Sequence, residues 1–136
     1  MEQKLKINNP LNIRHNSDTF VGEVSGYDND FKTFRDMASG YRAAFVTLHT
    51  YLVKYRRDTI EKIITAWAPP EDNNDTESYI ATVEKKSGIA RDKLLTDKSG
   101  EDYIKIVAAM AAVENGVKAV IKDVEAGFGM QWKITK

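Results

Sequence analysis

The chain has 136 residues, 42% of them hydrophobic and 29% charged, a composition typical of one soluble globular domain with a real core. Twenty lysines and arginines balance twenty aspartates and glutamates, so no global field draws the protein towards nucleic acid or an acidic membrane. Cysteine is absent, which excludes disulfides, thiolate metal sites and cysteine nucleophiles.

The start of the sequence, MEQKLKINNP, contains no apolar run of signal-peptide length, and no segment approaches the length of a membrane-spanning helix. We therefore expect a protein that is made in the cytoplasm, carries no signal peptide and is not inserted in a membrane. If it works outside the cytoplasm, another route must carry it there.

The stretch over residues 8–34 is rich in Asn, Asp and Gly, but apolar residues interrupt it throughout. A disordered linker would lack such anchors. We predict a β-hairpin across the mouth of a helical body, with a strand over 19–25, a turn over 26–30 and a return strand over 31–34. Its carboxylates, amides and hydroxyls suit a carbohydrate ligand, but an ordinary solvated hairpin accounts for the same residues.

Helical patterns fill most of the remaining chain. We predict helices at 39–55, from 58 to the Pro69-Pro70 stop, at 76–87 with Gly88 as its end, at 103–115, and at 117–126.

Local signals mark the ends and connections of these helices. Ser39 is the expected N-cap of the first helix, and Asp58 to Glu61 form the capping box that opens the second. Between the longer helices, residues 89–95 suggest a brief helical turn that carries Leu94 and Leu95 into the core. After residue 126 we expect an irregular or extended segment.

These elements predict a mostly α (α+β) fold. We expect a single domain over residues 1–136, with a β-hairpin region at 8–35 and a helical body at 36–127. The sequence shows no internal repeat and no domain linker.

Several kinds of site are poorly supported. His15 and His49 are the only histidines, and no carboxylate at ligand spacing completes a metal site around either, so we predict none. No elbow motif frames a nucleophilic serine, and no glycine-rich loop is present to bind phosphate.

Carboxylates are the remaining candidates for chemistry. Glu114 ends an alanine-rich helix, where packing does not require an acid, and half-burial would let it hold a proton as a general acid must. The competing interpretation is that Glu114 faces water or pairs with a lysine. Glu23, Asp28 and Asp30 of the hairpin are candidate partners, because glycoside cleavage uses an acid on one side of the bond and a carboxylate or an activated water on the other.

Two resemblances bear on these candidates. The motifs NNPLNIR, FVG, SGYRAA and WAPPEDNNDTESYI resemble a family of small phage and prophage proteins, described as virion structural or lysis-associated, over about residues 8–88. This sequence has Leu11 where that family has glycine and Phe20 where it often has tryptophan, and its EDNNDT loop carries one extra residue. Asn12, Arg14, Trp67, Asn73 and Tyr79 match family motif positions.

The segments PLNIR, FVG and FKTFRDMASGYRAAFVTL are also similar to the β-region of autolysin and flagellar-type glucosaminidases of the lysozyme-like superfamily. In those enzymes the catalytic glutamate ends a helix upstream, in an E-S-G motif. Here too few residues precede Asn8 for such a helix, but Glu114-Asn115-Gly116 ends a helix near the other terminus. The resemblance therefore implies a circularly permuted lysozyme-like domain with Glu114 as general acid and, by a loose match, Glu23 as base or stabiliser.

The resemblances imply a peptidoglycan-cleaving glycosidase or lytic transglycosylase that needs no cofactor. Asn12, Arg14, Asp28, Asn73 and Tyr79 are the expected contacts to glycan strands, and Trp67 is either a core residue or a sugar platform. The expected location is a virion or the cell wall, with other virion proteins as further partners and no nucleic acid. The alternatives are a non-enzymatic phage structural or glycan-binding protein, and a small protein-interaction module.

Overall fold

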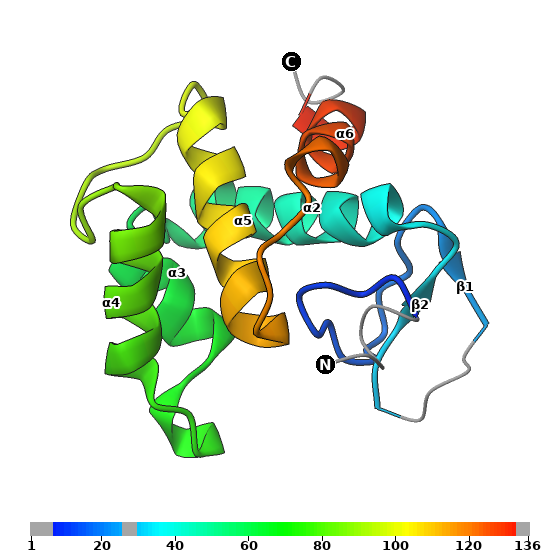
Figure 1. The fold of residues 1–136 in the computed structure, drawn as a ribbon, viewed down its shortest axis with the longest axis horizontal. Coiled ribbons are helices and arrows are strands. Elements are labelled where there is room, and N and C mark those ends of the chain that lie inside the picture. Colours follow the sequence, from blue (N-terminus) through cyan, green and yellow to red (C-terminus); the bar gives the residue numbers. More distant parts are fainter. Residues whose placement is uncertain (1–6, 26–29, 133–136) are drawn as a thin grey trace.

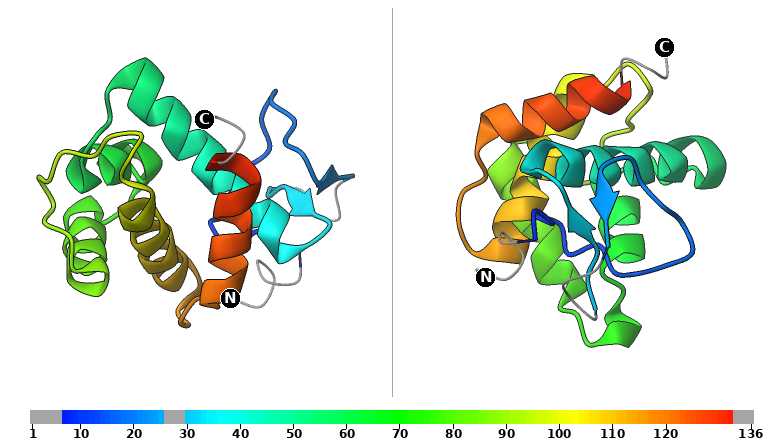
Figure 2. Two further views of the ribbon diagram at one scale, coloured as in Figure 1. Left: turned by 90° about the horizontal axis from the view of Figure 1, so that it is seen from above. Right: turned by 90° about the vertical axis from the view of Figure 1, so that its right-hand side faces the viewer.

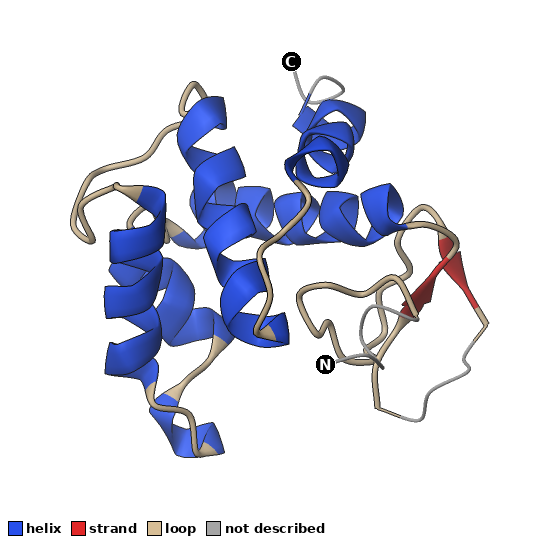
Figure 3. Ribbon diagram, viewed as in Figure 1, coloured by secondary structure: helices blue, strands red, loops and turns tan. Residues whose placement is uncertain are grey.

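A computed structural model describes residues 7–25 and 30–132, without the side chains of 131 and 132. Helices dominate and one small antiparallel sheet lies near the start, which confirms the predicted α+β class (Figure 3). In chain order the elements are β1 (Glu23–Val24), β2 (Thr33–Phe34), α2 (Met37–Tyr55), α3 (Ile60–Trp67), the 3-10 turn η1 (Pro70–Asp72), α4 (Thr76–Ser87), α5 (Gly100–Asn115) and α6 (Ile121–Trp132).

The long helix α2 runs behind α5, and the other elements are arranged around this pair (Figure 1). Helices α3 and α4 lie to one side of α5, and the β-hairpin lies to the other. Helix α6 packs along α2, which is the most extensive contact between two elements, and Figure 2 shows this from two further directions.

One cluster of buried apolar side chains joins all of the helices. Leu11, Ile13 and Phe34 bring the N-terminal segment and the sheet into the same cluster. The side chains that are completely excluded from solvent include Phe45, Leu48, Ile60, Ile63, Ile64, Val83, Tyr103, Ile106, Val107 and Met110. The polar N-terminal stretch is therefore anchored by its apolar residues.

The hairpin is shorter than predicted. Among the described residues, Glu23↔Phe34 and Val24↔Thr33 are the pairs in the sheet, and an isolated bridge joins Arg14 to Phe31. A strand over the whole of 19–25 is wrong because the backbone turns there: the Glu23 N–H donates to the Phe20 carbonyl at 3.1 Å, and Gly22 has a φ of 85°. Most of the predicted turn, residues 26–29, lies outside the described residues.

Two helix starts differ from the prediction by a few residues. Helix α2 is capped by Asp36, whose carboxylate accepts the Ser39 N–H at 2.8 Å, so Ser39 is not the cap but lies inside the helix. Helix α3 is capped by Thr59, whose hydroxyl accepts the Lys62 N–H at 3.2 Å, rather than by Asp58. In both helices the first residue is set by a carboxylate or hydroxyl that accepts the free backbone N–H three residues later.

Helix α4 has the predicted bounds and ends at Gly88, whose φ is 73°. The predicted helical turn over 89–95 is reduced to one hydrogen-bonded turn, in which the Lys93 N–H donates to the Ala90 carbonyl at 3.0 Å, and contacts with the start of α3 hold the rest of the segment. The Leu95 N–H donates to the Asp58 carbonyl at 2.8 Å, and the Glu61 N–H donates to the Arg91 carbonyl at 3.2 Å. Leu95 is buried as expected, but Leu94 is 68% exposed.

The last two helices differ from the prediction in their bounds. Helix α5 begins at Gly100 rather than at Tyr103. Helix α6 begins at Ile121 rather than at Val117, and it runs through residues 127–132, where an irregular or extended segment was expected. Packing on α2 explains this extension, since the Phe128 ring meets the Phe45 ring edge-on at 5.3 Å between centroids.

Candidate active-site cleft

Hydrogen bonds from asparagine side chains, rather than a regular sheet, fix the backbone of the N-terminal segment. Asn9 is fully buried, its amide donates to the carbonyls of Ile13 and Lys32, both at 2.8 Å, and its oxygen accepts the Ile13 N–H at 2.9 Å. Asn8 and Asn12 adopt positive φ values of 57° and 58°, which asparagine tolerates better than most residues. Leu11, which stands in place of the family's glycine, needs no such conformation and is fully buried.

The C-terminal end of α5 lies against this segment (Figure 1). The buried Asn115 side chain donates to the Pro10 carbonyl at 2.8 Å and to the Ala111 carbonyl at 2.9 Å. The N-terminal segment and the end of α5 are therefore joined next to Glu114, which precedes Asn115.

Glu114 is half-buried and is held by two side chains from distant parts of the sequence. Asn12 donates its amide to Oε1, and the Tyr79 hydroxyl donates to Oε2 at 2.9 Å. The structure thus brings together Asn12, Tyr79 and Glu114, which were singled out in the sequence as separate candidates.

The hydroxyl of Tyr79 remains a donor under all ordinary conditions. Burial raises the pKa of Tyr79 well above its usual value, and the charge of Glu114 and the hydrogen bond to it raise that pKa further. The Tyr79–Glu114 contact is therefore a hydrogen bond that a neutral phenol donates to a Glu114 oxygen.

Glu114 lies at the wall of a cleft with a volume of about 560 Å³. Arg14 and Asn12 also line it, as does Trp67, which is therefore not a purely internal core residue. The other lining residues are Leu11, Ile13, His15, Asn16, Asp18, Phe20, Phe31, Thr47, Ala68, Asp72 and Asn74. The cleft therefore combines aromatic rings, which can stack on a ligand, with amide and carboxylate groups, which can form hydrogen bonds to it.

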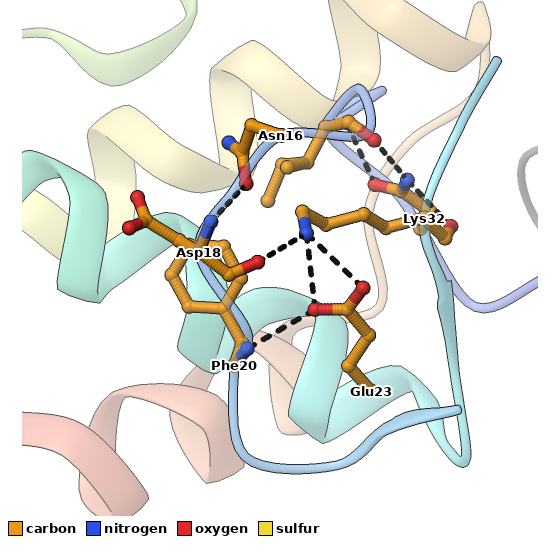
Figure 4. Close-up of polar contacts among 7 residues, drawn as sticks. Asn16, Asp18, Phe20, Glu23 and Lys32 are labelled. Carbon is orange, nitrogen blue, oxygen red and sulfur yellow. Dashed lines mark hydrogen bonds and ion pairs between the residues drawn. The ribbon is translucent and has the colours of Figure 1, made fainter. Parts of the chain in front are cut away.

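Glu23 is used differently from the role expected for it. Both of its carboxylate oxygens lie 3.1 Å from the Lys32 amino group, and Oε1 also accepts the Phe20 N–H at 3.1 Å (Figure 4). Glu23 is not among the residues that line the cleft. The structure therefore does not place its carboxylate opposite Glu114.

The remaining predicted residues lie outside the cleft or outside the described residues. Asp28 is among residues 26–29, which the structure does not describe. Asn73 has a φ of 63° and closes η1, whereas its neighbours Asp72 and Asn74 line the cleft. Asp30 is not a lining residue.

Several lining residues were not singled out in the sequence, among them Asp18, Thr47, Asp72 and Asn74. Three of these belong to Asn- and Asp-rich loops, where turn chemistry explains the same composition. Thr47 lies within α2, and no local signal distinguishes it from other helical residues.

The described part of the chain offers neither a metal-binding cluster nor a membrane-spanning helix. Residues 7–25 and 30–132 contain no group of three His, Asp or Glu side chains arranged to hold a metal ion. Within the same residues, each helix is either too short or too polar to cross a membrane.

No protein-family model matches the chain. The chain is similar to Protein P5 of Pseudoalteromonas phage PM2, with 42% identity over 132 residues that cover 94% of this chain and 79% of P5. Such identity over most of both sequences confirms the predicted relationship to phage proteins. The chain belongs to the family of Protein P5 of Pseudoalteromonas phage PM2.

Proposed function

We propose that this protein is a peptidoglycan-cleaving glycosidase or lytic transglycosylase with a permuted lysozyme-like fold, in which Glu114 is the general acid. The observation that carries the proposal is the position of Glu114. It ends a helix at the wall of a polar, aromatic-lined cleft, and Asn12 and Tyr79 hold its carboxyl group in one orientation.

This arrangement suits proton transfer to a glycosidic oxygen. A protonated Glu114 facing the cleft would donate to the leaving oxygen, and the amide and phenol beside it would stabilise the carboxylate that remains. Both donors are already in place before the reaction, so no reorganisation is required.

The second participant is not Glu23 in this proposal, because Lys32 occupies both of its oxygens. Asp18 and Asp72 also line the cleft, and either carboxylate is a candidate to activate a water molecule. A lytic transglycosylase needs no such base for water, because a hydroxyl of the substrate attacks instead.

The second candidate function is a non-enzymatic virion protein that binds glycan or other virion proteins. The Glu23–Lys32 ion pair favours it, since it removes the carboxylate that was expected to act with Glu114. In either case we propose that the protein reaches the cell wall as part of a phage particle, with peptidoglycan strands as its partner.

The test is the clearing of purified peptidoglycan by wild type, Glu114→Gln and the control Glu125→Gln, which removes the same charge from an exposed position on α6. We expect Glu114→Gln to lose about 100-fold or more in rate, the usual contribution of a general acid. Glu125→Gln should clear like wild type. Circular dichroism melting curves establish that all three proteins are folded.

If Glu114→Gln clears peptidoglycan as fast as wild type, the protein is still a peptidoglycan-cleaving enzyme, but Glu114 is not its general acid. If the folded wild type clears nothing between about pH 5 and pH 8, the range in which such acids and bases titrate, the enzyme proposal is overturned and the virion-protein function is favoured.

A further inference from the structure

We propose that Arg14 forms a carboxylate-binding subsite in the cleft, which selects a free carboxylate of the peptidoglycan stem peptide over a neutral sugar chain. This inference rests on the proposed function, since it names the part of the substrate that the same cleft recognises. It assigns to Arg14 a contact with the acidic substituent rather than with the sugar ring.

Arg14 is exposed and fixed in direction. Its backbone forms the bridge to Phe31, and its guanidinium group lies 4.9 Å from the centre of the Phe31 ring. Both residues line the cleft. Contact with an aromatic face limits the rotation of a guanidinium group, and the planar group carries all of its N–H donors at its edge.

No carboxylate of the described residues forms an ion pair with Arg14, although Asp18, Asp72 and Glu114 line the same cleft. Arg91 shows the contrasting case: its guanidinium group lies 2.7 Å from a Glu61 oxygen and 2.6 Å from a Glu77 oxygen. Within residues 7–25 and 30–132, no carboxylate therefore competes with a ligand for the edge donors of Arg14.

The charges of the cleft favour one ligand position. A planar guanidinium binds a carboxylate through two parallel hydrogen bonds, whereas a neutral hydroxyl offers only weaker single bonds. The carboxylates of Asp18 and Asp72 would repel an acidic group placed beside them in the cleft. Arg14 is thus the position at which an acidic substituent is attracted.

The experiment measures binding by calorimetry in the Glu114→Gln protein, so that turnover does not consume the ligand. The probes are a disaccharide–tetrapeptide from peptidoglycan, which is acidic, and chitotetraose, which is neutral. The second substitution is Arg14→Gln, and the matched control is Arg57→Gln. Arg57 also stacks on an aromatic ring, with its guanidinium 4.7 Å from the centre of Tyr51, but does not line the cleft.

We expect Arg14→Gln to weaken binding of the disaccharide–tetrapeptide by about tenfold or more, as is usual for a lost hydrogen bond to a charged group. Binding of chitotetraose should be unchanged, and Arg57→Gln should change neither. Equal weakening for both probes, no weakening for either, or no binding of the acidic probe to the parent protein would each overturn the subsite.

The two proposals fail in different ways. If wild type clears no peptidoglycan but Arg14→Gln still loses affinity only for the acidic probe, the proposed catalytic role of Glu114 is wrong and the Arg14 subsite is supported. If wild type clears peptidoglycan but Arg14→Gln binds both probes normally, the enzyme stands and the subsite is wrong.

Discussion

At the scale of single residues, Lys32 is a charged side chain buried next to two residues of the cleft, Asp18 and Phe20. Its side chain is 1% exposed, yet its amino group has three acceptor atoms: the Asp18 carbonyl at 2.8 Å and the two Glu23 oxygens at 3.1 Å (Figure 4). An ammonium group has three donors, so its capacity is filled. The pair connects β1 to the return segment and holds Asp18 and Phe20 at the cleft.

The replacement Lys32→Met tests this role. Breaking a buried ion pair leaves one charge uncompensated, and because Glu23 remains 15% exposed we expect a loss of about 3 kcal/mol in unfolding free energy, the low end of the usual range. Urea denaturation gives the value. The control is Lys62→Met, whose pair with Asp58 is exposed and should contribute less than about 1 kcal/mol. Similar losses in both variants would contradict the role of Lys32.

At the scale of elements, caps decide where helices begin. The carboxylate of Asp36 is the N-cap of α2, and it also has the charge sign that suits a helix N-terminus. Two groups of Ser39 lower the pKa of Asp36 from its ordinary value of 3.8. The larger effect comes from the Ser39 hydroxyl, and the smaller one comes from the hydrogen bond that the Ser39 N–H donates. Because the pKa is lower in the folded state, ionised Asp36 stabilises the fold above pH 3.8, and this contribution is lost as the pH falls through the folded-state pKa.

We therefore expect Asp36→Ala to lose about 1 kcal/mol of stability at neutral pH, the typical value of an N-cap. Asp36→Asn keeps a capping oxygen, and at neutral pH it should lose only the smaller part that comes from the charge. The difference between wild type and Asp36→Asn should shrink as the pH falls below about 4, where the wild-type carboxyl becomes protonated. Chemical denaturation at several pH values measures this, and a pH-independent difference would contradict the assignment.

At the scale of the whole molecule, α6 closes the fold by packing against α2. A Cβ atom added at Gly127 would lie 2.6 Å from the Tyr41 Cβ and 2.7 Å from the Arg42 nitrogen. Both neighbours belong to α2, so the absence of a side chain sets how closely the two helices approach. Gly129 lies on the same helix but has no atom within 4 Å of such a position.

The pair Gly127→Ala and Gly129→Ala separates packing from helix propensity. Gly127→Ala should destabilise the protein by about 1–3 kcal/mol, because the methyl group forces the helices apart. Gly129→Ala should be neutral or stabilise by up to about 1 kcal/mol, the difference in helix propensity between the two residues. Thermal unfolding curves measure both. A stabilising Gly127→Ala would show that α6 does not pack on α2 as described.

Local sequence signals by themselves determined the class of fold and several helix bounds. Proline stops α3, Gly88 ends α4, and the apolar period of α2 predicts its end at Tyr55. These signals act within one turn of the chain, so they need no knowledge of the rest. For the same reason the residue type and position of Glu114, at the end of an alanine-rich helix, could be singled out before its partners were known.

Only the tertiary structure decided which residues meet. The partners of Glu114 are 102 and 35 positions away in the sequence, and the loop residues Asp18, Asp72 and Asn74 face the same cleft without any shared pattern. Glu23 was expected in the site, but the burial of Lys32 gives it a nearer use as a counter-ion. Residues 127–132 are helical because α2 offers a surface for them. Contacts of this kind depend on the packing of distant segments, which local propensity does not encode.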